Sequence, residues 1–267
     1  MTPQPLILPK LAFWLLVVVT ATVLLRRRLV TSKVRVAFVI GGMLVFGFVF
    51  GQLIPGGQNP NPVASVRSLF QGLLVAEKLI PLVGAMLLLL LLVSWVSNKA
   101  ICGWGCQLGL LQDLLNRVPT KKWRPPFCLS NSVRIVSFLA LVGGLAIVGL
   151  DWIGLIDPFA LFTLEMTLAI ALAVGIILLA SLFIYRPWCH FFCPFGLLTW
   201  LLEQVSLLRP RINRDVCKGC QLCVKACPGH AMGDIFEGKA LHGDCFACGA
   251  CIEACPHPDA LGWRGKV

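Results

Sequence analysis

Long apolar blocks alternate with short polar stretches along this chain. A helix of about 20 apolar residues spans a bilayer, and five blocks approach that length, at about 6–25, 36–54, 79–97, 135–153 and 166–185. Among charged residues only Lys10 and Asp151 fall inside these blocks, each near an end. The first block lacks the basic start and small-residue exit of a secretory signal, so we interpret it as an anchor. The pattern predicts an all-α membrane domain of about five transmembrane helices.

Composition agrees with a membrane location. The chain has 267 residues, of which 58% are hydrophobic and 13% charged, and its mean hydropathy is +0.85. A soluble domain has far more charge. The basic excess lies in the short loops between apolar blocks, where it indicates topology signals and contact with membrane lipid, with no nucleic acid as partner. All four His follow the last block, so no His pair lies at membrane depth to hold a haem.

The basic loops predict the orientation. Before Arg186 the chain has fourteen Lys and Arg, and eleven of them lie in the loops after the first and third blocks. By the positive-inside rule these loops are cytoplasmic, which also places the C-terminal tail inside. Every cysteine then lies on the reducing side, where thiols persist. We expect a multi-pass protein of the bacterial cytoplasmic (inner) membrane with a cytoplasmic C-terminal domain.

Part of the membrane domain is duplicated. One helical hairpin opens at Val34-Arg35 and ends at Lys99-x2-Cys102-x3-Cys106, and a second opens at Val133-Arg134 and ends at Arg186-x2-Cys189-x3-Cys193. An apolar helix is expected after each motif, with Pro194 in the first turn of the second. Two helices separate equivalent points, so both cysteine pairs should emerge on one face, as in a parallel repeat. The breaker-rich turns at 54–62 and 151–158 should lie on the outer side.

The strongest chemical signal is near the C-terminus. Two runs of the form C-x2-C-x2-C-x3-C-P match the bacterial pattern for two [4Fe–4S] clusters, in which the fourth cysteine of each run ligates the other cluster. One cluster should use Cys217, Cys220, Cys223 and Cys255, and the other Cys245, Cys248, Cys251 and Cys227. Gly219 and Gly249 should allow the backbone to approach the clusters closely. Zinc is the alternative, but zinc sites pair two C-x2-C units and lack the final x3-C-P.

The two C-x3-C motifs, with Cys102, Cys106, Cys189 and Cys193, are candidate cofactor-binding residues. Each alone fits a buried structural pair, because free cysteine is among the most buried residue types. Together they supply four thiolates on one face, enough for a third metal centre. Both interpretations stay open at this point.

These motifs together resemble the NapH/MauN family of ferredoxin-type membrane proteins, whose relatives include the C-terminal region of NosR. The resemblance covers about residues 34–260 and implies membrane helices, two cytoplasmic C-x3-C-P motifs and a ferredoxin-like domain. It also implies a quinol dehydrogenase-type or electron-delivery component with a quinone or quinol as ligand and iron–sulfur or cytochrome subunits as redox partner proteins. This sequence departs from the family in two respects. Gln107 stands where proline follows the second cysteine, and the sequence predicts five helices where the family core has four.

Quinol oxidation would release protons and need an acceptor. Glu165, beside the last apolar block, is the candidate catalytic residue, because an ionisable group at such depth is costly without a role. A solvated carboxylate at a helix start is the alternative. Four tryptophans, Trp104, Trp123, Trp188 and Trp200, suggest an interfacial belt, and His190 and Cys128 are interpreted as bystanders.

The sequence divides into a polytopic membrane domain, 1–209, and a ferredoxin-like α+β domain, 210–267. Three functions fit this organisation. The leading hypothesis is electron exchange between the quinone pool and a partner redox enzyme. The alternatives are a biogenesis or regulatory protein that supplies electrons for metal-cofactor maturation, and a sensor that responds through cluster loss.

Overall fold

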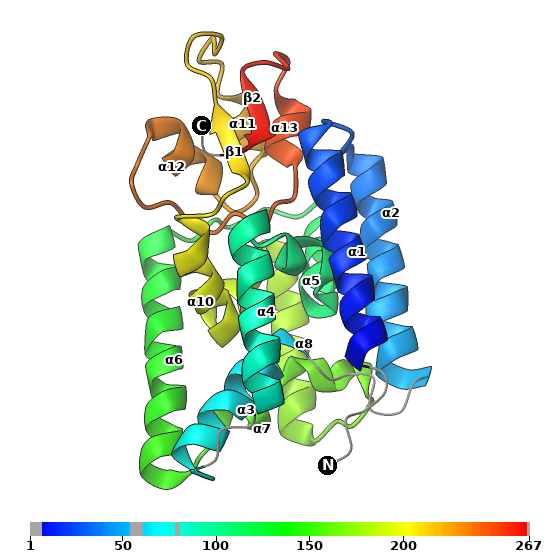
Figure 1. Cartoon of the computed structure of the whole chain (residues 1–267), viewed down its shortest axis with the longest axis vertical. Coiled ribbons are helices and arrows are strands. Elements are labelled where there is room, and N and C mark those ends of the chain that lie inside the picture. Colours follow the sequence, from blue (N-terminus) through cyan, green and yellow to red (C-terminus); the bar gives the residue numbers. More distant parts are fainter. Residues whose placement is uncertain (1–6, 54–60, 78–80, 266–267) are drawn as a thin grey trace.

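A computed structural model describes residues 7–53, 61–77 and 81–265. It is mostly helical, with a bundle that is capped at one end by a small C-terminal domain (Figure 1). The long helices are α1 (Ile7–Arg26), α2 (Ser32–Gly42) continued by the π-helix η1 (Met43–Leu53), α4 (Pro81–Ser97), α6 (Phe127–Val148) and α8 (Leu168–Phe183). The shorter helices of the bundle are α3 (Pro62–Leu74), η2 (Ile101–Gly105), α5 (Gln107–Asn116), α7 (Trp152–Leu155), η3 (Pro158–Phe162), α9 (Pro187–Phe191) and α10 (Pro194–Glu203).

The bundle has the surface of a membrane protein. Within the described residues, three helices are long and apolar enough to cross a bilayer: Pro9–Arg26, Ser32–Leu53 and Phe127–Val148. They match the first, second and fourth predicted blocks, while α4 and α8 match the third and fifth but are shorter. Outward side chains on the long helices are apolar, with Ile147 of α6 84% exposed and Ile176 of α8 68% exposed. Apolar surface of this extent belongs in lipid.

Two predicted spans begin too late. The predicted block at 36–54 corresponds to a helix that starts at Ser32, where the Thr31 side chain accepts a hydrogen bond from the amide of Val34 and caps the first turn. The block at 135–153 corresponds to α6, which starts at Phe127 and ends at Gly149, a left-handed residue with φ of 67°. Hydropathy missed the first turns of α6 because they carry polar residues, including Asn131 and Arg134, that are nevertheless buried.

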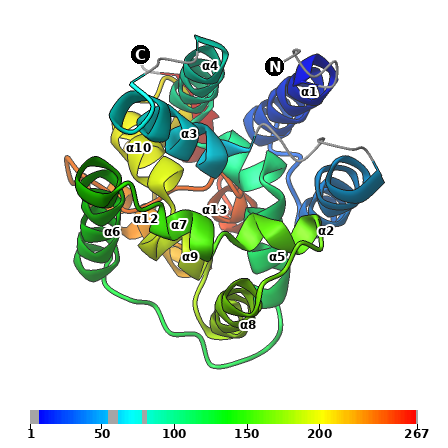
Figure 2. The same cartoon turned by 90° about the horizontal axis from the view of Figure 1, so that it is seen from below.

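Short helices occupy the interior behind the long ones. Seen from the opposite end in Figure 2, α5, α9 and α10 lie nearer the middle, and α1, α2, α4, α6 and α8 stand around the edge. Helix α5 packs against α2 and α8, and α10 packs against α6 and α4. Each therefore contacts the first long helix of its own sequence unit and the second long helix of the other unit. Pro194 lies in the first turn of α10, as predicted.

The end of the bundle opposite the C-terminal domain is described only in part. Most of the predicted turn at 54–62 lies outside the described residues, and its last described residues begin α3, with Asn61 accepting a hydrogen bond from the amide of Ala64. The predicted turn at 151–158 contains α7 and the start of η3. Arg67 of α3 joins this turn through ion pairs with Asp151 and with Asp157, the latter at 2.7 Å.

The C-terminal domain is a ferredoxin-like α+β unit. Strand β1 (Arg209–Ile212) pairs antiparallel with β2 (Leu261–Arg264), so the segment's two ends close on each other. Between the strands lie three short helices, α11 (Leu222–Ala226), α12 (Ala231–Glu237) and α13 (Ala250–Ala254). Arg28, in the turn after α1, donates hydrogen bonds to the carbonyl oxygens of Ile252 and Cys255 at 2.9 and 3.0 Å. The turn between α1 and α2 thus helps to seat the domain on the bundle.

Candidate metal-cluster sites

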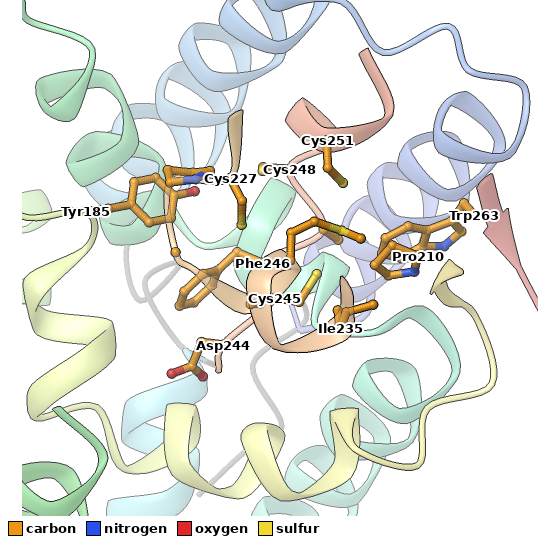
Figure 3. Close-up of a pocket in the computed structure, with 16 residues that line it drawn as sticks. Tyr185, Pro210, Cys227, Ile235, Asp244, Cys245, Phe246, Cys248, Cys251 and Trp263 are labelled. Atoms are coloured by element: carbon orange, nitrogen blue, oxygen red, sulfur yellow. The ribbon is translucent and has the colours of Figure 1, made fainter. Parts of the chain in front are cut away.

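Two hollows in the C-terminal domain gather its eight motif cysteines. The distal hollow is lined by Cys217, Cys220, Cys223 and Cys255. The proximal hollow, closer to the bundle, is lined by Cys227, Cys245, Cys248 and Cys251, several of which are drawn in Figure 3. Each hollow thus combines three cysteines of one motif with the fourth cysteine of the other. These are the same two sets that the motif pattern assigns to two clusters.

The local backbone explains how the loops turn around these hollows. Gly219 and Gly249 have φ of 69° and 80°, a region that other residues adopt at a cost. A Cβ on Gly249 would also lie 2.7 Å from the Val30 side chain, so this glycine lets the loop meet the turn between α1 and α2. Among the described residues, no three His, Cys, Asp or Glu side chains are placed to bind one metal ion together. A cubane is a larger object than a single ion, because four irons and four sulfides separate its thiolates.

The two hollows differ in surroundings. Around the distal hollow, Cys220 and the neighbouring Lys218 and Gln221 are exposed. The proximal hollow has apolar walls that include Met232 and Trp263, both at most 3% exposed, and Tyr185 from the bundle also lines it. The distal site therefore faces water, and the proximal site faces the membrane part of the protein.

A buried ionic cluster joins the proximal hollow to the bundle. Asp244, immediately before Cys245, pairs with Lys99 and with Arg134, the latter at 2.9 Å. Lys99 also pairs with Glu203 at 3.1 Å, and Glu203 accepts a hydrogen bond from the amide of Cys245 at 3.1 Å. Burial alone would raise the pKa of Asp244, but the charges of Arg134 and Lys99 hold it well below its usual value. Asp244 is thus a buried carboxylate anion.

A second ionic cluster lies around Asp113 of α5. Arg35 pairs with Asp113 at 2.7 Å and Arg186 pairs with it at 3.2 Å. Arg35 also donates a hydrogen bond to the carbonyl oxygen of Gly103 at 2.6 Å, and Arg186 donates one to that of Cys102 at 2.7 Å. Charged groups therefore surround the backbone of the first C-x3-C motif.

The two C-x3-C motifs meet inside the bundle. Cys102, Cys189 and Cys193 are buried and Cys106 is partly buried. Burial raises the pKa of Cys189 to about 12, and the pKa values of Cys102 and Cys193 also rise, partly through the other thiols of the set. We call these four residues the four-thiol set. The thiols of the two motifs are close enough to raise one another's pKa, and their raised pKa values mean that without a metal they would be neutral thiols.

The first C-x3-C motif touches the loop of the proximal hollow. The indole nitrogen of Trp104 donates a hydrogen bond to the carbonyl oxygen of Ala247 at 2.8 Å. A Cβ on Gly103 would lie 2.0 Å from the carbonyl oxygen of Phe246, so only glycine allows this approach. Gly103 and Trp104, which lie between Cys102 and Cys106 in the sequence, therefore contact the loop of the proximal hollow directly.

Several polar residues were missed or misjudged. His190 is not a bystander, because its Nδ1 lies 3.3 Å from Asp244. The predicted belt is wrong for Trp104, Trp188 and Trp200, which are at most 8% exposed and belong to the interior, whereas Trp123 is 55% exposed. One signal was available for the ionic residues: Lys99 and Arg186 stand at the same position before their motifs.

Glu165 lies away from the cysteine sites. It is exposed, in the segment between η3 and α8, and lines a polar cavity with Arg67 and Asp157. The described residues that line this cavity include no cysteine.

Comparison with known proteins agrees with the motifs. Residues 209–256 match a family model described as a 4Fe-4S dicluster domain. A second model, described as a 4Fe-4S binding domain, matches twice, over 79–126 and 166–214, and each match contains one C-x3-C motif. No solved structure matches this chain.

Three curated relatives illustrate the similarity. YccM of Escherichia coli is 27% identical over 65% of this chain and 54% of its own length. The methylamine utilization ferredoxin-type protein MauN of Methylorubrum extorquens is 29% identical, over 62% of this chain and 59% of its own. The regulatory protein NosR of Pseudomonas aeruginosa is 26% identical, over 79% and 32%. The match thus spans little more than half of YccM and MauN and about a third of NosR.

Proposed function

Since this chain belongs to the NapH/MauN-type family of ferredoxin-like membrane proteins, we propose that its iron–sulfur electron-transfer role is that of a quinol dehydrogenase-type component. It would pass electrons between the quinone pool and a partner redox enzyme. The observation that carries the proposal is the crossed composition of the two hollows, one with Cys255 beside Cys217, Cys220 and Cys223, the other with Cys227 beside Cys245, Cys248 and Cys251. These cysteines would ligate two [4Fe–4S] clusters, which supply one-electron transfer when bound.

The four-thiol set is our candidate for a third metal centre. Two features support it. The family model for 4Fe-4S binding covers both motifs, and buried cations outnumber buried carboxylates around them. Lys99, Arg134, Arg186 and Arg35 are at most 2% exposed, and three buried carboxylates, Asp113, Asp244 and Glu203, face these four cations among the described residues. Neutral thiols would leave that positive charge unbalanced in a low dielectric. Four thiolates on a metal centre carry the negative charge that balances it.

The protein's own residues would order the sites. The four-thiol set contacts the proximal loop through Gly103 and Trp104, and the distal site reaches solvent at Cys220. Electrons would therefore pass between the bundle and a soluble partner through the proximal and then the distal site. Asp244, Lys99 and Arg134 would hold the proximal site against the bundle.

The finer topology belongs to the same proposal. We include α4 and α8 as spans, which gives five, and we relate the unit α2–α5 to the unit α6–α10 as a parallel repeat, with residues 210–267 as the cytoplasmic domain. The matched packing of α5 and α10 supports the repeat. A reporter fused after Val267 should behave as cytoplasmic and one inserted at Thr163 as external, in the cytoplasmic membrane of a bacterium. Two cytoplasmic readings would reject this topology.

Glu165 would accept protons if quinol were oxidised on the outer side. Its polar cavity with Arg67 and Asp157 supports access to water there. Its separation from the cysteine sites favours the simpler role of a solvated carboxylate. Glu165→Gln should slow quinol oxidation if Glu165 accepts protons, and should leave the rate unchanged if Glu165 is a solvated carboxylate.

The second candidate function is regulatory or maturational. It is favoured by the name of one relative, the regulatory protein NosR, which matches more of this chain than YccM or MauN does. The discriminating experiment is anaerobic redox titration of the purified protein, followed by mixing with a quinol analogue. Reduction of the clusters by the quinol analogue at a rate at least tenfold above the uncatalysed rate supports the quinol dehydrogenase role. Clusters that quinol never reduces support the second candidate.

A further inference from the structure

A lateral pocket lies between the first two membrane helices. Its volume is about 450 Å³, and it is lined by apolar residues of α1, among them Phe13, Leu16 and Val17, and of α2 and η1, among them Phe38 and Phe46. Leu16 is 59% exposed and Phe13 39%, so the pocket opens at the apolar surface that faces lipid. Its size and lining are those of pockets that bind small apolar ligands.

The inner end of this pocket reaches the electron-transfer sites. Trp104 lines the pocket and is otherwise fully buried. It stands between Cys102 and Cys106 in sequence, and its indole nitrogen bonds to Ala247 in the proximal loop. The Arg35 guanidinium lies 4.3 Å from the Trp104 ring centroid. A ligand in the pocket would therefore touch a side chain shared by the four-thiol set and the proximal site.

Two details of the pocket wall bear on what it can bind. A Cβ placed on Gly41 would meet nothing within 4 Å, so the wall there is left open. Thr20 also lines the pocket, and its hydroxyl makes no hydrogen bond within the described residues, whereas the hydroxyl of Thr22 bonds to the carbonyl oxygen of Val18 at 2.7 Å. A hydroxyl in apolar surroundings without a partner is unfavourable. A ligand with a carbonyl or hydroxyl group would satisfy it.

We propose that the lateral pocket binds the ring of a lipid-soluble quinone, with the isoprenoid tail leaving between α1 and α2. The proposal rests on the quinol-linked function proposed above and identifies the site where the quinol would bind. A redox molecule that enters from lipid must be apolar, must fit a pocket of this size and must offer oxygen atoms to Thr20. Quinones meet these requirements, and a phospholipid acyl chain lacks the oxygen atoms at that depth.

The test uses the full-length protein in nanodiscs and a short-chain benzoquinone that carries a photoreactive azido group. Gly41→Leu should fill the pocket and weaken binding at least tenfold. Gly175→Leu on α8 is the matched control, because a Cβ there also meets nothing within 4 Å, and it should bind as the unchanged protein does. Thr20→Val, which keeps the side-chain shape, should weaken binding by a few-fold. Peptides that contain residues 13–20 and 37–46 should carry the label.

Three outcomes would contradict quinone binding in the lateral pocket. They are equal binding by Gly41→Leu and the unchanged protein, labelling confined to other helices, and displacement of the probe by phospholipid as readily as by unlabelled quinone. The iron content and the spectra of the dithionite-reduced clusters are recorded on the same samples. Missing clusters would count against the proposed function, whereas intact clusters with no quinone in the pocket would count against this inference alone.

Discussion

Asp113 and Asp244 play the same part in the two sequence units, although Asp113 belongs to α5 of the bundle and Asp244 to the C-terminal domain. Arg35 and Arg134, which open the two hairpins, bind Asp113 and Asp244 respectively. The basic residue before each C-x3-C motif binds the carboxylate of the other unit, so that Arg186 pairs with Asp113 and Lys99 with Asp244. Lys99 and Arg186 even share a left-handed backbone, with φ of 60° and 49°. The domain thus supplies the carboxylate that binds both Arg134 and Lys99, and Glu203 of α10 is a second partner of Lys99.

Asp244→Asn should release the domain from the bundle. The substitution leaves Lys99 and Arg134 buried without their anion, a loss that typically costs roughly 3–5 kcal/mol. We expect a lower temperature of domain unfolding and faster proteolysis in the segment that leads to β1. The exposed Asp259 offers the control, since Asp259→Asn should change neither. Equal stability of Asp244→Asn and Asp259→Asn would mean that the ion pairs of Asp244 do not hold the domain on the bundle.

Exchange of single cysteines should separate the two clusters. Cys227→Ser should damage the cluster held by Cys245, Cys248 and Cys251, and Cys255→Ser the other one, because the fourth ligand crosses between motifs. Electron paramagnetic resonance of the two reduced variants, measured side by side, should find complementary losses. Damage to the cluster nearest in sequence would contradict the crossed sets.

The four-thiol set should hold iron of its own. If it binds a cubane, the anaerobically purified protein contains about twelve iron atoms, and Cys102→Ser or Cys189→Ser lowers this to about eight. Cys128 is the natural control, because it is an exposed thiol outside both motifs, and Cys128→Ser should change nothing. About eight iron atoms in the unchanged protein would leave the set as buried structural thiols.

Gly103→Ala should disturb the contact between the bundle and the proximal site. The added methyl group would lie 2.0 Å from the Phe246 carbonyl oxygen, which forces the loop away at a cost of about 1–3 kcal/mol. Hydrogen exchange at residues 244–248 should become faster. Gly84→Ala, where the methyl group meets nothing within 4 Å, should have no such effect. Unchanged exchange in Gly103→Ala would mean that the loop is not held by this contact.

The cysteine sets could be predicted because short, fixed spacings bring ligands together almost independently of the rest of the fold. The ionic residues could not. Asn131 and Arg134 resemble a polar loop before an apolar block, and only Asp244, 110 residues later in the chain, explains their burial. The burial of Trp104 could not be predicted either. Tryptophan is typical of the membrane interface, but the indole nitrogen of Trp104 donates a hydrogen bond to the carbonyl oxygen of Ala247. Interactions between residues so far apart in the sequence leave no local sequence pattern.

The position of Asp244 also bears on the order in which the protein is made. Helix α4, which precedes Lys99, and helix α6, which carries Arg134, enter the membrane before residue 244 is synthesised. Both cations must therefore wait for the Asp244 carboxylate until the last tenth of the chain emerges. Residue 244 becomes available only with the cysteine run that follows it. We therefore expect that the buried ionic contacts of the bundle are completed late, together with the folding of this cysteine run.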